Sequence, residues 1–202
     1  MLSEGGAVRM PDTASLTKVP PILGDEEGRV KLGGSGNHPS TGVPALILVR
    51  HGETEWSRSG QHTGPTDIPL TPNGEEQARA AGTLVRRLLR DRMPSLVISS
   101  PRRRAVHTAE LAGFPAQIIT EDAAEWDYGA FEGLTSKQIQ QSTPNWSIWD
   151  GPVPGGENAA TITARIDRLL ESVMTSSADG PVLIFSHGHA SRCIAARWLG
   201  QP

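Results

Sequence analysis

Three short apolar segments, each ending in cationic or imidazole side chains, constrain the fold more than any other feature of this sequence. Residues 45–49, 95–100 and 181–186 have the length and apolar character of buried strands. Helical patterns separate them, which is typical of an α/β protein with a largely parallel sheet. In such a sheet the carboxyl ends of the strands share one edge and form the usual ligand crevice. We therefore expect one cluster of the side chains that follow the strands, namely Arg50, His51, Arg102, Arg103, Arg104, His187 and His189.

The segments between these strands predict helices on both faces of the sheet. Thr71 and Pro72 are typical of a helix N-cap and first helical position, and apolar residues follow at helical spacing. Further helices are predicted at 158–176 and 190–199, whereas glycine and proline predict loops at 56–70 and 146–156. The expected fold is an α/β three-layer sandwich, with a mostly parallel central sheet and helices on both faces. The first helix should bury Ala78, Ala81, Leu84, Val85, Leu88 and Leu89.

The charge and cysteine content exclude several classes of partner. The 202-residue chain has a formal net charge of −3, which gives no basic footprint for nucleic acid or for an anionic membrane. An anionic ligand therefore needs a local cluster of cations. The single cysteine, Cys193, cannot form an internal disulfide, and its place in a helical apolar pattern predicts a packing role. With no segment that resembles a secretion signal or a membrane span, we expect a cytoplasmic protein.

The residue types at the expected crevice suit phosphoryl-transfer chemistry. The Arg50 guanidinium presents a fork that matches a phosphate group, and the His51 imidazole can attack phosphorus as a nucleophile. Arg104 and His187 would complete the clamp on the phosphoryl group, and Glu125 is the candidate acid for the leaving oxygen. The chain has no glycine-rich loop ending in Gly-Lys, so a nucleotide-binding kinase is disfavoured.

A metal centre is the alternative chemistry for the same histidines. His187 and His189 could ligate a metal ion in a metallohydrolase, together with His51 or an acidic residue. The arginines argue against this hypothesis, because a metal ion would itself supply the positive charge that they provide. We expect no metal and no cofactor. His62 in a loop and His107 on a helix face are not expected to be ligands.

Five motifs, in order along the chain, resemble those of the histidine phosphatase superfamily, also called phosphoglycerate mutase-like. They are LVRHGETEW at 48–56, TG at 63–64, RRAVHT at 103–108, EWDYG at 125–129 and HGH at 187–189. The resemblance implies an enzyme that forms a phosphohistidine on His51, with Arg50, Arg104 and His187 binding the phosphoryl group. It also implies that Glu125 is the general acid and base, and that a small-molecule phosphate ester releases inorganic phosphate.

Within the superfamily, the motifs look most like the branch of sedoheptulose-1,7-bisphosphatase and its bacterial phosphatase relatives. Ser57 stands six positions after His51, where mutases usually carry asparagine, so a phosphatase of sugar phosphates, sugar bisphosphates or other small phosphorylated metabolites is favoured. The alternatives are a cofactor-dependent phosphoglycerate mutase and a catalytically silent module that binds phosphorylated ligands. A homodimer is compatible with the sequence. The residues that we assign to substrate binding are Ser57, Arg58, Gln61, Thr63, Gly64, Glu157, Gly188 and His189.

The beginning of the chain departs from the order usual in the family. There the nucleophile strand begins the domain, whereas here residues 1–32 precede it, and 12–17 look like the family's usual C-terminal segment. Residues 33–44 have the Gly/Ser-rich composition of a linker. We therefore expect an engineered circular permutant, in which 1–32 supply the family's C-terminal strand or hairpin to the core at 45–202 as one structural domain. A permutant of reduced activity is one alternative to a fully active phosphatase. The alternative is a natural chain with an N-terminal extension.

Overall fold

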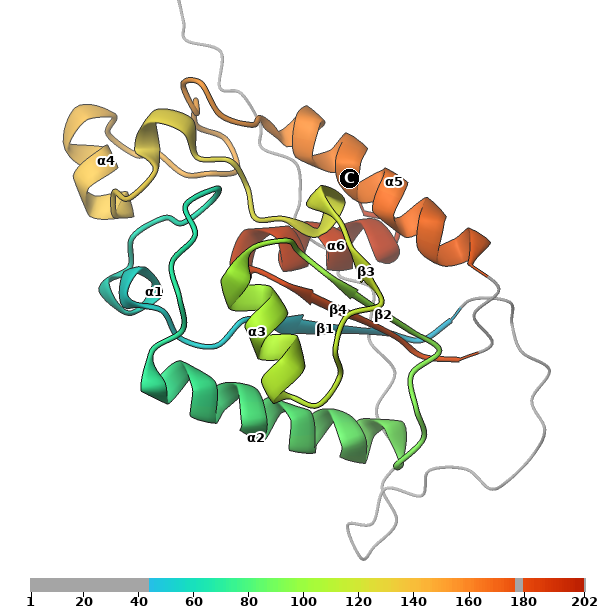
Figure 1. Cartoon of the computed structure of the whole chain (residues 1–202). Helices are drawn as coiled ribbons and strands as arrows, with labels where there is room; N and C mark the ends of the chain where they lie inside the picture. Colours follow the sequence, from blue (N-terminus) through green and yellow to red (C-terminus); the bar gives the residue numbers. More distant parts are fainter. Residues whose placement is uncertain (1–43, 177–179, 202) are drawn as a thin grey trace, which may run out of the picture. The chain divides into compact units, whose positions relative to one another are not determined.

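The computed structural model describes residues 44–176 and 180–201, and a four-stranded parallel sheet lies at its centre (Figure 1). The order across the sheet is β1-β4-β2-β3, and each of these pairings is parallel. The predicted α/β fold with a parallel sheet is confirmed. The expectations for residues 1–43, the circular permutation included, lie outside the described residues. The strands are β1 (Leu46–Arg50), β2 (Leu96–Ser99), β3 (Ile118–Ile119) and β4 (Val182–Ser186).

The register between β1 and its neighbour β4 places the carboxyl ends of the two strands at the same level. Arg50 of β1 pairs with Ser186 of β4. The backbone N–H of His51 then donates to the carbonyl oxygen of Ser186 at 3.1 Å. His51 and His187, the residues that follow the two strands, leave the sheet together, and their ring centroids are 5.2 Å apart.

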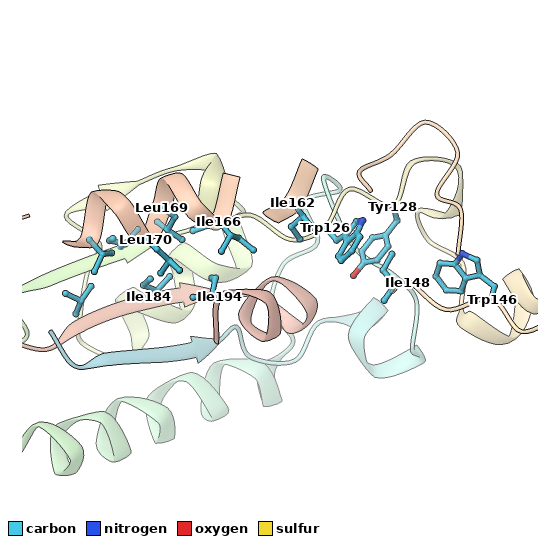
Figure 2. Close-up of a cluster of buried hydrophobic side chains, with 14 of the residues drawn as sticks. Trp126, Tyr128, Trp146, Ile148, Ile162, Ile166, Leu169, Leu170, Ile184 and Ile194 are labelled. Atoms are coloured by element: carbon cyan, nitrogen blue, oxygen red, sulfur yellow. The ribbon is translucent and has the colours of Figure 1, made fainter. Parts of the chain in front are cut away.

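Alternate side chains of β4 pack into two cores, one on each face of the sheet. Leu183 and Phe185 pack with residues of α2 and α3, whereas Val182 and Ile184 pack with residues of α5 and α6. Figure 2 shows the second core, where side chains of α5 lie over Ile184. A strand covered on both faces is expected to be continuously apolar, and residues 182–185 of β4 are. The helices are α1 (Glu55–Ser59), α2 (Pro72–Leu89), α3 (Arg103–Leu111), α4 (Ser136–Ser142), α5 (Ala159–Thr175) and α6 (Gly188–Trp198), with 3₁₀ turns η1 (Glu121–Ala123) and η2 (Gly129–Phe131).

The buried face of α2 differs from the predicted one. Leu84 and Leu88, which we expected in the core, are 58% and 68% exposed. The helix turns a glycine inward instead, and a Cβ on Gly82 would lie only 2.2 Å from the carbonyl oxygen of Ala112, just after α3. This close approach of two backbones sets the rotation of α2, so the two leucines stay in solvent.

A short helix, α1, interrupts the segment that we expected to be an irregular loop. The Thr54 hydroxyl accepts from the backbone N–H of Ser57 at 3.1 Å, and the Ser57 hydroxyl accepts from the backbone N–H of Thr54 at 2.9 Å. This reciprocal capping box satisfies two donors that would otherwise be unpaired at the start of the helix. α1 ends at Gly60, whose φ of 79° is a conformation that glycine adopts at little cost.

The segment between α4 and α5 is irregular, as its prolines and glycines predict. Trp146 anchors it, because its ring is 4% exposed and its Nε1 donates to the carbonyl oxygen of Pro152 at 2.9 Å. Trp149 stays 44% exposed and packs edge-on against Trp126. Among the helices in the described part of the chain, none is both long and apolar enough to cross a bilayer.

Candidate active site

A cavity of about 200 Å³ lies where β1 and β4 end, between α1, α6 and the segment after β3. Most of the residues that we assigned from the sequence converge on it. Those that line it are Arg50, His51, Ser57, Gln61, Thr63, Glu125, Gly188 and His189. The lining residues that we did not assign are Gly60, His62, Tyr128 and Arg192.

The His51 imidazole is neutral and has an unprotonated ring nitrogen. Its Nδ1 lies 2.7 Å from the carbonyl oxygen of Gly52, and because a carbonyl can only accept, Nδ1 carries the proton. Nε2 is left with a lone pair. Burial, and to a smaller extent the cationic Arg104 and Arg50, lower the pKa of His51 to about 3, although the hydrogen bond to Gly52 opposes the shift. A neutral ring with a free lone pair is what nucleophilic attack requires.

Two glycines set the position of His51. A Cβ on Gly52 would lie 2.1 Å from the carbonyl oxygen of Gly74, so the turn after β1 packs directly against the first turn of α2. The backbone N–H of Gly52 donates to Oγ1 of Thr108 on α3 at 3.1 Å. Two neighbouring helices thus hold the carbonyl group that fixes the His51 tautomer.

Arg50 is exposed and lines the cavity beside the first turn of α6. A Cβ on Gly188 would lie 3.7 Å both from Nε of Arg50 and from Oε2 of Glu125. The guanidinium and the carboxylate therefore flank the same glycine. A planar guanidinium in this place can bind two phosphate oxygens at once.

Arg104 and His187 lie behind the cavity, fully buried and joined to each other. Nε of Arg104 donates to Nδ1 of His187 at 3.2 Å, and Nε2 of His187 lies 2.7 Å from the Ser100 hydroxyl. A guanidinium can only donate, so Nε2 of His187 carries the proton. Burial lowers the pKa of His187 well below its ordinary value, and the Arg104 cation adds to the shift. The second imidazole of the site is therefore neutral as well.

The remaining contacts of Arg104 shape one wall of the cavity. Its Nη1 donates to the carbonyl oxygen of Thr66 at 2.8 Å, and its Nη2 donates to those of Thr63 at 2.9 Å and Gly64 at 3.0 Å. Neither Arg104 nor His187 lines the cavity itself. In this structure Arg104 organises the loop that follows α1.

Glu125 is held by the first turn of α6. Its Oε1 accepts from the backbone N–H groups of Ala190 at 2.8 Å and Trp126 at 2.9 Å, and its Oε2 accepts from that of His189 at 3.1 Å. The N–H groups at a helix N-terminus lack partners within the helix and attract negative charge. These three bonds fix a carboxylate in the wall of the cavity.

A tyrosine orients the half-buried imidazole of His189, which also lines the cavity. The Tyr128 hydroxyl lies 2.6 Å from Nδ1 of His189. Burial raises the pKa of Tyr128 well above its ordinary value, so the phenol stays protonated and donates. His189 then carries its proton on Nε2. His62 packs on the Tyr128 ring with 4.6 Å between centroids, which makes it part of the site although we expected only a loop residue.

Spacing is the signal that could have found the lining residues that we missed. Tyr128 stands in the EWDYG motif three positions after Glu125, and His62 adjoins an assigned residue on either side. Arg192 follows Gly188 by four positions, so one turn of α6 places both on the same face.

Three residues that we assigned to substrate binding lie away from the cavity lining. Arg58 extends into solvent and is ion-paired with the glutamate three positions before it. The backbone N–H of Gly64 donates to both carboxylate oxygens of Glu132 at 2.9 Å. Glu157 is ion-paired with Arg165 at 2.7 Å. Each of these residues has a partner within the protein in place of a position in the cavity wall.

The histidines of the HGH motif are engaged in hydrogen bonds. Both ring nitrogens of His187 have partners, one of which is the Arg104 guanidinium, and Nδ1 of His189 meets the Tyr128 hydroxyl. Within residues 44–176 and 180–201, no three histidine, cysteine or acidic side chains come together as a group of metal ligands.

The relationships of the chain to known proteins agree with this site. Residues 46–202 match the model of the Histidine phosphatase superfamily (branch 1). An acid phosphatase of Mycobacterium tuberculosis is 45% identical over 157 residues, which cover 78% of this chain and 76% of that protein. The sedoheptulose 1,7-bisphosphatase of Saccharomyces cerevisiae is 34% identical over an alignment of 185 positions, and the match covers 78% of this chain and 68% of that protein.

A solved structure supports the same relationship at the level of the fold. The product of an open reading frame of Mycobacterium tuberculosis matches with a TM-score of 0.73 and 44% identity, over 78% of this chain and 80% of the other. The motifs, the parallel sheet and the cationic cavity at its carboxyl edge are thus found together with extensive identity to phosphatases. The chain belongs to branch 1 of the histidine phosphatase superfamily.

Proposed function

We propose that this protein is a metal-independent phosphatase of small phosphorylated metabolites, sugar phosphates and bisphosphates among them, that acts through a phosphohistidine at His51. The observation that carries the proposal is the hydrogen bond from Nδ1 of His51 to the carbonyl oxygen of Gly52, since it leaves Nε2 unprotonated. His51 lines the same cavity as Arg50 and Glu125. The acid phosphatase and the sedoheptulose bisphosphatase among the relatives support the reaction class.

In the first step, Nε2 of His51 donates its lone pair to phosphorus, and the bond between phosphorus and the ester oxygen breaks. Glu125 gives a proton to that oxygen, which leaves as an alcohol. Arg50 neutralises the phosphoryl oxygens from the cavity wall. We also assign Arg104 and His187 to the clamp, and because neither lines the cavity, this role requires them to exchange present protein partners for the phosphoryl oxygens. His51 is left as a phosphohistidine.

In the second step, water attacks the phosphohistidine. Glu125 takes a proton from the water, the bond between phosphorus and Nε2 breaks, and the electron pair returns to His51. Inorganic phosphate leaves, and the proton on Glu125 is available for the next leaving group. One carboxylate can serve both steps because three backbone N–H groups hold it in one place.

The size and the lining of the cavity favour a substrate whose leaving group is small and polar. Its volume of about 200 Å³ is small for a ligand pocket, and its wall carries the imidazoles of His62 and His189 and the Arg192 guanidinium. Such groups form hydrogen bonds with the hydroxyls of a sugar. A large apolar alcohol would leave them without partners.

The experiment that tests the proposal is phosphate release from a panel of sugar monophosphates and bisphosphates, with and without EDTA. We expect turnover that resists the chelator and is abolished in His51→Ala. Radiolabelled phosphate should be trapped on the protein in a form that is stable to alkali and labile to acid. Turnover that is lost with EDTA and survives in His51→Ala would overturn the proposal.

Two further measurements distinguish a phosphatase from a mutase and from a silent binding module. A mutase would interconvert phosphoglycerates after priming with 2,3-bisphosphoglycerate, whereas a phosphatase releases phosphate without priming. A silent binding module would bind phosphate without turnover of any phosphomonoester. We expect release without priming.

A further inference from the structure

We propose that Arg165 is a positioning residue for the reaction, which places Glu125 by holding the backbone of the segment that carries it. The inference rests on the proposed function, because it takes Glu125 as the group that transfers the proton. Arg165 lies on α5, is 8% exposed and does not line the cavity with His51. Its effect on the reaction must therefore pass through other residues.

All the donors of the Arg165 guanidinium are used. Nη1 donates to the carbonyl oxygens of Asp122 at 3.1 Å and Ala124 at 2.9 Å, and Nη2 donates to that of Glu125 at 3.0 Å. The remaining two bonds go to the Glu157 carboxylate, from Nε at 2.7 Å and from Nη2 at 2.8 Å. A guanidinium has five N–H donors in a rigid plane, so three of them fix the backbone that leads to Glu125.

Glu157 extends the same network beyond Glu125. Its carboxylate accepts from the backbone N–H of Asp127 at 3.1 Å, and its own N–H donates to the Asp127 carbonyl at 2.9 Å. Its carbonyl accepts from the Trp126 indole at 2.9 Å. The pair formed by Arg165 and Glu157 thus holds the backbone on both sides of Glu125.

Glu125 needs this support because of where it lies in the chain. It stands between η1 and η2, in a stretch with no helix or strand to satisfy its backbone groups. Buried backbone carbonyls require partners, and here one side chain from α5 supplies three of them. Proton transfer demands hydrogen-bond distance to the leaving oxygen, and a displacement of about 1 Å can cost about 100-fold in rate.

The test compares kcat/KM for two substrates that differ in their need for an acid. Glycerol 2-phosphate loses an alkoxide that must be protonated, whereas 2,4-dinitrophenyl phosphate loses a stable phenolate that need not be. In Arg165→Met/Glu157→Gln, which leaves no uncompensated carboxylate, we expect kcat/KM for the alkyl ester to fall by about 10- to 100-fold. For the aryl ester, kcat/KM should fall by less than about threefold. Arg165→Lys, which retains the charge, should give a smaller loss with the same selectivity.

Arg168→Met is the matched control. Arg168 lies three positions further along α5 and pairs with the Asp122 carboxylate at 2.7 Å, but its side chain is 61% exposed and it holds none of the three carbonyls. In Arg168→Met, kcat/KM for each of the two esters should stay within about twofold of its value in the unchanged protein. Should the double variant fail to fold, Arg165→Lys carries the same comparison.

Glu125→Gln separates a failure of this inference from a failure of the proposed function. If Glu125→Gln does not selectively lower kcat/KM for the alkyl ester, Glu125 is not the acid and the proposed mechanism fails. Glu125→Gln can show the selective loss while the Arg165 variants lower kcat/KM equally for both esters, or for neither. In that case Arg165 has only a structural role. Selective loss in both sets of variants, with Arg168→Met unchanged, supports the positioning role.

Discussion

The hydroxyl oxygen of Tyr128 lies 2.6 Å from Nδ1 of His189, so a buried phenol decides which nitrogen of that imidazole carries the proton. Burial and the cations Arg192 and Arg50 lower the pKa of His189, against the effect of Glu125, so the ring stays neutral. Nε2 of His189 is then an N–H donor on a cavity-lining residue. In the proposed function this donor meets a hydroxyl or phosphoryl oxygen of the substrate.

Tyr128→Phe should weaken substrate binding with little effect on chemistry. The substitution keeps the ring that fills the core and removes the bond that sets the His189 tautomer. We expect KM for a sugar phosphate to rise by about fivefold, which corresponds to the net worth of one hydrogen bond, about 1 kcal/mol. Steady-state kinetics measure the change, with kcat expected to stay within about twofold. A fall in kcat at constant KM would place Tyr128 in the chemical step instead.

Arg50 and Arg58 form a matched pair for testing which cation binds phosphate. Arg50 lines the cavity, whereas Arg58 is ion-paired in solvent. We expect Arg50→Met to lower kcat/KM by about 100- to 1,000-fold, the usual cost of a lost charge-stabilising donor. Arg58→Met should stay within about twofold, because an exposed ion pair contributes little. Comparable losses in the two variants would contradict the arrangement of the site.

Gly52→Ala should destabilise the fold, since the added Cβ would lie 2.1 Å from the carbonyl oxygen of Gly74. Either the turn or the start of α2 must shift, and we expect the free energy of unfolding to fall by about 1–3 kcal/mol. The control is Gly188→Ala, whose Cβ would find its nearest neighbours at 3.7 Å. Urea unfolding of both variants measures the difference. Equal stability would show that the two backbones can separate without cost.

The fold was predictable from the sequence where apolar pattern alone reports burial. The run at 182–185 is apolar at every position because β4 is covered on both faces, and Thr71 with Pro72 marks the start of α2. The buried face of α2 was not predictable from helical periodicity. It depends on the contact between Gly82 and Ala112, which are distant in sequence, and the exposed Leu84 is the consequence.

The functional site was also predictable only in part, because some of its contacts join segments that are distant in the sequence. The rule that ligands bind at the carboxyl ends of parallel strands, with the family motifs, placed Arg50, His51 and Glu125 around one cavity. The partners of Glu157 could not be predicted in this way. Glu157 pairs with Arg165, and both side chains bind the backbone of residues 122–127, a segment about 30 to 40 positions earlier in the chain. No spacing within the sequence indicates that contact.

Acid should destabilise the protein through His51. Its pKa is lowered from 6.5 to about 3 on folding, so between these values the unfolded chain binds a proton that the folded protein excludes. The free energy of unfolding therefore falls as the pH drops through 6.5 towards 3. From about pH 7.5 to about pH 5, His51 should account for about 2 kcal/mol of that fall. Urea unfolding at the two pH values measures it, and the fall should be about 2 kcal/mol smaller in His51→Asn. Equal falls in the two proteins would mean that the folded protein accepts the proton on His51.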